Sequence, residues 1–244
     1  MQYTVTVYDS LESTNLTAKQ LAAQGAPEGT VIVARHQEGG RGRLGRRFYS
    51  PEGTGLYMSV ILRPRAELSL VTDITTAAAV AAAEAIEETV GKPVAIKWVN
   101  DIYYRDRKVC GILAEGGVEQ GVLSYVVLGI GVNISPPKGG FPDDIAEKAG
   151  TLFDVDIDVS NELTQRLLER FDAYYHTLAE YTHRQGYRSR SWLDGKQVQI
   201  LSTDDTPQET VTVLGVDQDL SLIVSKDGKQ WNLRSGDVSV IPLK

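Results

Sequence analysis

The sequence predicts an α/β (α+β) fold in two parts: a mixed β-sheet flanked by helices over residues 1–190, and a small β-barrel over residues 191–244. Two observations lead to this division. Apolar runs typical of strands alternate with segments of helical spacing as far as Leu178, whereas after Trp192 only short strand-like runs remain, separated by turn residues. A chain of 244 residues also suits one large domain with a small appendage.

The first part is expected to contain strands and three helices. The expected strand ranges are 3–8, 30–35, 55–64 closed by a proline, 94–99, a hairpin of 102–104 with 108–115, and 123–134. A short helix follows Asn15 and stops at Gly25, and an alanine-rich helix over 70–90 ends at Gly91. A third helix is capped by Ser160 and carries apolar residues at helical spacing.

The second part is expected to hold five short strands. Their ranges are 196–201, 210–216, 220–224, 230–233 and 237–241. Turn residues lie between them, including Asp-Gly at 194–195 and 227–228 and Ser-Gly at 235–236. This pattern predicts a five-stranded barrel.

Composition and charge limit the class of protein. Hydrophobic residues make up 42% of the chain, enough for a core, and no apolar run approaches the roughly 20 residues that span a bilayer. The opening MQYTVTVYDS lacks the basic and apolar regions of a signal peptide, and a single cysteine, Cys110, excludes an intramolecular disulfide. We therefore expect a cytoplasmic protein without a membrane partner, in which Cys110 is a small core residue. The net charge of −7 argues against a general nucleic-acid binder.

A local basic cluster stands out against this acidic background. Arg41, Arg43, Arg46 and Arg47 fall within a glycine-rich loop that matches the dinucleotide fingerprint G-x-G-x-x-G literally. Turn residues follow it instead of a helix, and no Gly-Lys-Ser/Thr ending is present, so neither a Rossmann nor a P-loop site is expected. Glycines allow close backbone approach, and arginine forks bind phosphate or carboxylate.

The alternating Arg41 and Arg43 would share one face of an extended loop and could hold two anions together. The alternative is a solvated loop.

A second group of polar residues lies at predicted strand ends. Lys97, Asn100-Asp101 and Lys108, with Gly111 nearby, could form another anion site. The alternatives are a strand-end lysine whose ammonium reaches solvent and an ordinary Asn-Asp turn. Trp98 is expected in the core. A third group, Gly129-x-Gly131-x-Asn133, places glycines in an apolar strand, which is typical of a bulge or a close approach by ligand or backbone; Asn133 alone could be a turn former.

Ser13-Thr14-Asn15 precedes the first helix, where Ser or Thr is a plausible N-cap, and a helix N-terminus also binds polar or anionic groups. The three histidines lack metal-ligand spacing, so no metal site is expected, and His176 and His183 are expected on or near the surface of the long helix.

Taken together and in order, these motifs resemble those of biotin–protein ligases. The motifs are Glu12-Ser13-Thr14-Asn15, Gln37-x-x-Gly40-Arg41-Gly42-Arg43-x-Gly45-Arg46, Lys97-Trp98-x-Asn100-Asp101, Lys108-x-x-Gly111-Ile112-Leu113-x-Glu115 and Gly129-x-Gly131-x-Asn133. The resemblance covers nearly the whole chain, and the C-terminal barrel, SH3-like in that family, is in the matching place. Larger members add an N-terminal DNA-binding domain. This chain begins directly with the catalytic segment, so the resemblance implies the monofunctional type without a nucleic-acid partner.

The resemblance also implies residue roles. Biotin would be held by Ser13, Thr14, Asn15, Gln37, Arg41, Gly42, Arg43, Lys108 and Gly111. ATP and the adenylate would be held by Arg43, Arg46, Phe48, Lys97, Asn100 and Asn133. Arg41, Arg43, Lys108 and Asp101 are the expected catalytic residues. Phe48 stands where the family commonly has tryptophan, and Val99 where it commonly has proline.

The activity implied is ATP-dependent biotinylation of a lysine. The biotin carboxylate attacks the α-phosphate of Mg-ATP, and a lysine of a biotin carboxyl carrier protein or domain then attacks the biotinyl-5′-adenylate, oriented or deprotonated by Asp101. A homodimer is also expected. Alternatives are a lipoate-type acyl-adenylate ligase, a non-catalytic biotin sensor, and a nucleic-acid-binding module.

Overall fold

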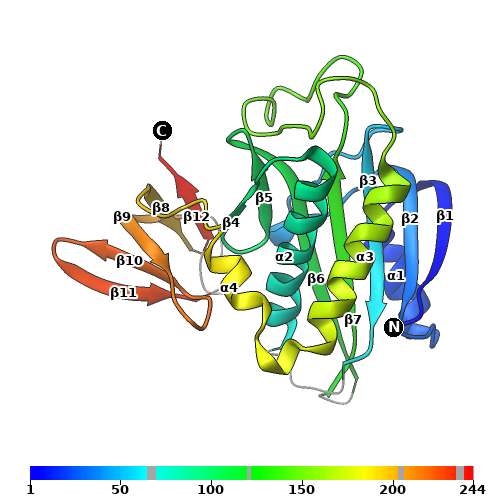
Figure 1. Ribbon diagram of the computed structural model, residues 1–244, viewed down its shortest axis with the longest axis horizontal. Helices are drawn as coiled ribbons and strands as arrows, with labels where there is room; N and C mark the ends of the chain where they lie inside the picture. Colours follow the sequence, from blue (N-terminus) through cyan, green and yellow to red (C-terminus); the bar gives the residue numbers. More distant parts are fainter. Residues whose placement is uncertain (65–69, 120–121, 203–205, 235–238, 244) are drawn as a thin grey trace.

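The first part of the chain folds around one mixed seven-stranded sheet in this computed structural model, which describes residues 1–64, 70–119, 122–202, 206–234 and 239–243 (Figure 1). The strand order is β1-β2-β3-β7-β6-β5-β4. Only β1 and β2 pair in parallel; the other neighbours pair antiparallel. The bounds are β1 Thr4–Leu11, β2 Thr30–Gln37, β3 Gly55–Leu62, β4 Ala95–Lys97, β5 Asp101–Tyr104, β6 Arg107–Glu119 and β7 Val122–Asn133. The predicted mixed sheet is confirmed.

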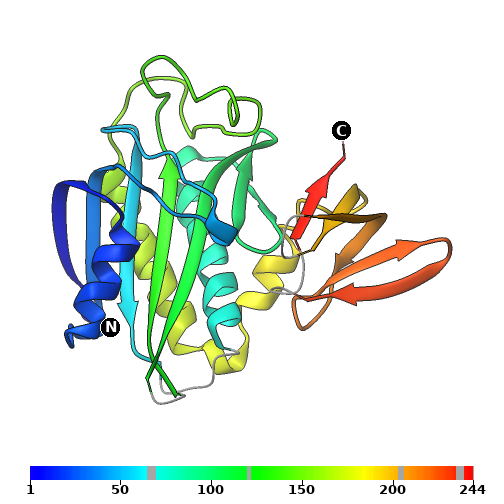
Figure 2. The same cartoon turned by 180° about the vertical axis from the view of Figure 1, so that it is seen from behind.

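Helices cover both faces of this sheet. The long helices α2 (Leu70–Val90) and α3 (Ser160–His176) lie on one face, and α1 (Thr14–Ala23) lies on the other (Figures 1 and 2). The face under α1 buries Ile32, Ile61 and Val127 against Ala18 and Ala22. The alternation of side chains along each strand supplies both hydrophobic cores.

The alanine-rich helix α2 occupies the predicted range 70–90 and ends at Gly91, whose φ is +66°. The residues from Ala77 to Ala83 along it are fully buried. Small side chains allow the helix axis to lie close to the sheet, where α2 packs beside α3 on the same face.

The C-terminal part forms a five-stranded antiparallel sheet of order β11-β10-β9-β8-β12. Its strands are β8 Gln197–Leu201, β9 Pro207–Val216, β10 Leu222–Lys226, β11 Lys229–Leu233 and β12 Ser239–Pro242. The predicted strands are therefore present; residues 237–238 of the last one and the Ser-Gly turn at 235–236 lie outside the described residues. Closure into an SH3-like barrel and the domain boundary at 190/191 stay predictions.

Three local predictions differ from the structure. The strand expected over 94–99 stops at Lys97, because residues 98–100 form a turn. Ser160 is the first residue of α3 rather than its cap; Val159 holds the cap position, while Ser160 donates its N–H and hydroxyl to Asp158. His176 lies on the surface as expected, but His183 is fully buried in the short helix α4 (His183–Arg188), so its predicted surface position is wrong.

No helix in the described part of the chain combines the length and apolarity needed to cross a membrane.

Candidate active site

The arginine–glycine loop forms a short hairpin over the sheet. Phe48 donates its N–H to Gly40 O at 2.9 Å, Gly42 donates to Arg46 O at 2.8 Å, and Arg41 bridges Arg47. The chain turns at the 3-10 segment Arg43–Gly45, so the loop is not extended through Arg43. The prediction that Arg41 and Arg43 share one face had assumed an extended loop. Beside the loop lies an open hollow of about 470 Å³, lined by Glu12, residues 39–47, Leu113 and Glu115.

Buried polar groups gather where α1 begins. Ser13, Thr14 and Asn15 are each less than 5% exposed. Ser13 holds the predicted N-cap position but makes no side-chain cap bond. Gln37 takes that role instead: its Oε1 accepts from Thr14 N at 2.8 Å and from Thr14 Oγ1 at 3.1 Å, while its Nε2 donates to Ser50 Oγ at 2.8 Å. The amide of Gln37 is thereby fixed in one orientation.

Asn15 is held by three neighbouring elements. Its Oδ1 accepts from the hydroxyl of Ser59 on β3 at 2.6 Å, and its Nδ2 donates to Glu115 Oε2 on β6 at 2.8 Å. Lys19 forms an ion pair with the other oxygen of Glu115. A Cβ at Gly129 on β7 would lie 2.0 Å from Asn15 Oδ1, so only glycine allows this approach. A close approach at that glycine was expected from a ligand or the backbone, and the structure shows that a side chain, Asn15, approaches it instead.

A cation-rich corner lies next to these groups, the polar wall of Thr14, Asn15, Gln37, Ser50 and Ser59. Gly131, which pairs with Gly111 beside Lys108, is two residues along β7 from Gly129, which borders Asn15. Arg43 Nη1 donates to Asn100 Oδ1 at 3.3 Å, and Asn100 Nδ2 donates to Ile112 O at 2.6 Å. Lys108 Nζ pairs with Asp101 Oδ1 at 2.6 Å. The Asn100-Asp101 turn therefore holds two of the predicted anion-binding cations. Trp98 and Val99 precede this turn in the chain.

Burial, reinforced by neighbouring cations, lowers the pKa of both Lys97 and Arg43. Burial lowers the pKa of Lys97, opposed by Asp101 and reinforced by Lys108, Arg46 and Arg43. Burial also lowers the pKa of Arg43, with Asp101 again opposing and Arg46 reinforcing. An anion placed here would relieve the mutual repulsion of the cations and replace lost solvation. Lys97 is also the partner of Asp101 across β4 and β5, which places it next to the corner.

A glycine slot receives the ring of Phe48. Gly111 and Gly131 are direct partners across β6 and β7. A Cβ at Gly131 would lie 2.6 Å from Phe48 Cε1, and one at Gly111 would lie 3.2 Å from Phe48 Cε2. Tyr57 completes the slot with its ring at 68° to Phe48 and a centroid separation of 6.4 Å. The two glycines therefore fix where the loop ends.

Other predicted site residues lie as follows. Arg41, Arg46 and Arg47 are exposed on the loop hairpin. Asn133 is buried and donates Nδ2 to Gly150 O at 3.0 Å, which secures the 134–159 connection. Trp98 is a core residue, as expected, with Nε1 donating to Leu220 O at 2.9 Å. Cys110 is fully buried, and burial raises the pKa of its thiol.

Sequence reasoning missed Ser59 and Ser50 as members of the polar wall. The signal for Ser59 was a single serine within the otherwise apolar and aromatic strand GLYMSVIL. Glu115 was noted only as part of a motif. No group of three or more His, Cys, Asp or Glu side chains suited to a metal ion occurs among the residues that the structure describes.

Comparisons with known proteins agree with this geometry. The model of the biotin/lipoate A/B protein ligase family matches residues 7–133. A bifunctional ligase/repressor BirA of Bacillus subtilis (strain 168) is 43% identical over 145 residues, which cover 59% of this chain and 45% of that protein. A biotin–[acetyl-CoA-carboxylase] ligase of Mycobacterium tuberculosis is 30% identical over 207 residues, covering 77% of this chain and 71% of that protein.

A solved structure extends the likeness to the whole chain. A biotin protein ligase of Aquifex aeolicus in complex with biotin and ATP superposes with a TM-score of 0.82 at 26% identity, over 98% of this chain and 99% of that one. The chain belongs to the biotin/lipoate A/B protein ligase family. It spans less than half the length of the Bacillus relative.

Proposed function

We propose that this protein joins biotin to a lysine of a carrier domain at the expense of ATP, through a biotinyl-5′-adenylate. The observation that carries the proposal is that two groups of residues lie next to each other. One is the polar wall of neutral, mostly buried side chains, and the other is the cation-rich corner around Arg43, Lys97 and Lys108. A small neutral polar ring with a carboxylate tail fits such a pair of surfaces, and the related Aquifex aeolicus structure holds biotin and ATP.

The polar wall suits the ureido ring of biotin, which offers two N–H donors and one carbonyl acceptor. Thr14 and Gln37 are fixed by their mutual bonds, and Asn15 is fixed by Ser59 and Glu115. A preorganised set of donors and acceptors binds without paying for side-chain ordering. Ser13 and Gly42 would complete this side of the pocket, with Gly111 allowing close approach at its far edge.

The cation-rich corner suits the reacting groups. The biotin carboxylate and the α-phosphate of ATP repel each other, and Arg43, Lys108 and Lys97 would neutralise both. The carboxylate oxygen attacks the α-phosphorus, the bond to the β-phosphate oxygen breaks, and pyrophosphate leaves with the electron pair. Positioning and electrostatic stabilisation dominate such phosphoryl chemistry. Arg41 and Arg46 on the exposed loop would close over the intermediate and exclude water.

The nucleotide side of the corner would consist of Asn100, Phe48 and Asn133. Asn100 is already bonded to Arg43, so it would set the position of that guanidinium against the phosphate. Phe48 offers an aromatic ring where the family commonly has tryptophan, and Asn133 secures the loop above.

Transfer to the carrier follows from the same corner. The amine of a lysine attacks the acyl carbon of the mixed anhydride, an amide bond forms, and AMP leaves. Asp101 would orient this amine and accept its proton. Because Asp101 pairs with Lys108 at 2.6 Å, that step would require the pair to open before the amine attacks.

Magnesium would enter with ATP. The corner offers a single carboxylate, Asp101, and no metal-ligand cluster occurs in the described ranges of the chain. Mg²⁺ would then be held chiefly by the phosphates of ATP and would supply positive charge to them. The partner would be a biotin carboxyl carrier protein or domain, and a cytoplasmic homodimer remains part of the proposal.

The second candidate is a lipoate-type ligase, because the family includes both activities. Lipoate lacks the ureido N–H and C=O groups, so it cannot hydrogen-bond to the polar side chains around Asn15 and Gln37 as biotin can, which favours biotin.

The test is isolation of the intermediate. The protein is incubated with biotin, α-phosphate-labelled ATP and Mg²⁺, with pyrophosphatase present. Labelled biotinyl-adenylate should remain bound and should disappear as AMP when a biotin carboxyl carrier domain is added, leaving one biotinylated lysine. Absence of a labelled adenylate with biotin, together with its formation from lipoate, would contradict the proposal.

A further inference from the structure

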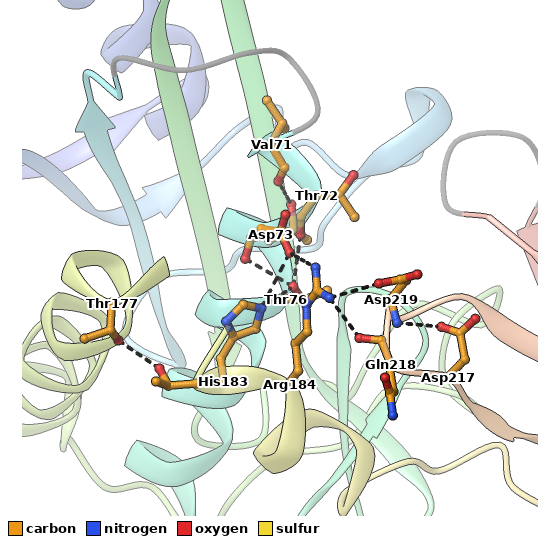
Figure 3. Close-up of polar contacts among 12 residues, drawn as sticks. Val71, Thr72, Asp73, Thr76, Thr177, His183, Arg184, Asp217, Gln218 and Asp219 are labelled. Carbon is orange, nitrogen blue, oxygen red and sulfur yellow. Dashed lines mark hydrogen bonds and ion pairs between the residues drawn. The ribbon is translucent and has the colours of Figure 1, made fainter. Parts of the chain in front are cut away.

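The short helix α4 connects three parts of the molecule. Its Arg184 donates to Asp73 Oδ1 at the start of α2, at 3.2 Å, and to Gln218 O and Asp219 Oδ1 in the turn between β9 and β10, at 2.9 and 3.1 Å (Figure 3). Arg188 donates to Val216 O at 2.9 Å. The helix is therefore fixed against both the first part of the chain and the C-terminal sheet.

The chain that leaves α4 runs beside β4. Ile96 N donates to Arg190 O at 2.6 Å, and Trp192 N donates to Ile96 O at 2.9 Å. These two bonds form a parallel bridge between Ile96 and Ser191. The segment that links the two parts is thus part of the support under the strand that leads into the site.

Two side-chain bonds hold the turn that follows β4. Tyr187 of α4 is fully buried, and its hydroxyl donates to Val99 O at 2.9 Å. Trp98 Nε1 donates to Leu220 O of the β9–β10 turn at 2.9 Å. The next two residues are Asn100 and Asp101, which contact Arg43 and Lys108. Both bonds therefore hold the segment Trp98–Val99, which leads directly into the residues that contact Arg43 and Lys108.

The Tyr187 hydroxyl lies in the electrostatic field of that corner. Burial raises its pKa, and Asp101 raises it further, whereas Arg43 lowers it. The phenol therefore stays protonated at every working pH, so it can always donate to Val99 O. A phenylalanine would fill the same apolar volume without this bond, so packing alone does not account for the hydroxyl.

We propose that Tyr187 is a positioning residue for the adenylation site. It acts through Val99 to hold the Asn100–Asp101 turn, and through α4 it connects the C-terminal sheet to the placement of Arg43 and Lys108. The kinetic part of this inference rests on the proposed function; the structural part does not.

The test compares Tyr187→Phe with a matched control, Tyr174→Phe. Tyr174 also donates one hydroxyl bond, to Glu84 at 2.7 Å, but it joins α3 to α2 away from the site. In Tyr187→Phe the amides of residues 97–102 should exchange with deuterium about tenfold faster, because their anchor is lost. Biotin-dependent ATP–pyrophosphate exchange should lose about tenfold in kcat, with the KM for biotin changed by less than about twofold.

The outcomes separate the two claims. Equal deuterium exchange over 97–102 in Tyr187→Phe and wild type overturns the inference, whatever the activity. A uniform loss of kcat in both variants, in proportion to a fall in Tm, would assign the tyrosine a merely structural role and overturns it too. If the wild type shows no biotin-dependent exchange, the proposed function fails, and the deuterium exchange still decides the role of Tyr187.

Discussion

The glycine slot yields a quantitative prediction. In Gly131→Ala the new Cβ would lie 2.6 Å from Phe48 Cε1 and 2.9 Å from its Cζ. Unbonded carbon atoms prefer a separation of about 3.5–4.0 Å, so the ring must move by about 1 Å. If the ring stays and the sheet yields, the overpacking should cost about 1–3 kcal/mol of stability.

If the ring moves instead, it takes the end of the arginine loop with it, because Phe48 N bonds to Gly40 O. A misplacement of about 1 Å at a reacting centre can cost about 100-fold in rate. We therefore expect biotin-dependent ATP–pyrophosphate exchange in Gly131→Ala to fall about 10- to 100-fold, with a small change in urea midpoint.

A double-mutant cycle isolates the cause. Phe48→Ala removes the ring that the new methyl would meet, so Gly131→Ala should cause little further loss on that background. Equal losses with and without the ring would show that Gly131 acts through something other than Phe48 and would refute the reasoning. Undiminished exchange in the single variant Gly131→Ala would refute it as well.

Three further predictions concern other parts of the site and core. Arg43→Ala should retain the fold by circular dichroism but lose adenylate retention, and pyrophosphate exchange equal to wild type would remove Arg43 from the mechanism. Ser59→Ala should leave Asn15 Oδ1 without its donor, lower stability by about 1–3 kcal/mol in urea titration, and raise the KM for biotin more than that for ATP. Burial, opposed by Asp73, lowers the pKa of His183 from 6.5 to about 4, so the unfolded chain binds its proton at higher pH. The corresponding stability, roughly 3 kcal/mol, should be complete above pH 6.5 and should vanish as the pH falls to 4; a His183→Gln variant should show a flatter stability profile over that window.

Much of the fold was predictable because hydrophobic periodicity records which faces are buried. Helix α2 occupies its expected range, and Gly91 ends it, because an unbroken run of helix formers meets a residue that adopts positive φ readily. The strand after it was predicted too long. Trp98 and Val99 are apolar and buried, but they lie in a turn. Hydrophobic periodicity shows only that they are buried and does not distinguish a buried turn from a buried strand.

The sequence predicted most of the residues that form the site, but it predicted fewer of the contacts between them. The order of the motifs placed Arg43, Lys108 and Asn100 together, and the structure brings them into one corner. The cap of α1 was assigned to Ser13 or Thr14 from local preference, whereas Gln37, more than twenty positions away, supplies it. Long-range partners of this kind have no local signature.

Buried polar residues were the hardest to predict. His183 and Tyr187 lie in a short helix whose sequence, HRQGYR, reads as surface. Their burial follows from the packing of α4 against α2, β4 and the C-terminal sheet. The pattern of a single sequence does not predict this packing, because it depends on the position of the C-terminal sheet relative to α4.

Adenylation specificity is the most direct test of the central claim that the polar wall and the cation-rich corner together activate biotin. Wild-type protein is assayed for ATP–pyrophosphate exchange with Mg²⁺ and either biotin or lipoate, at equal concentrations. The account predicts exchange with biotin and little or none with lipoate, because only biotin carries a ureido group that can hydrogen-bond to the polar wall around Asn15 and Gln37. Exchange driven by lipoate alone would contradict it.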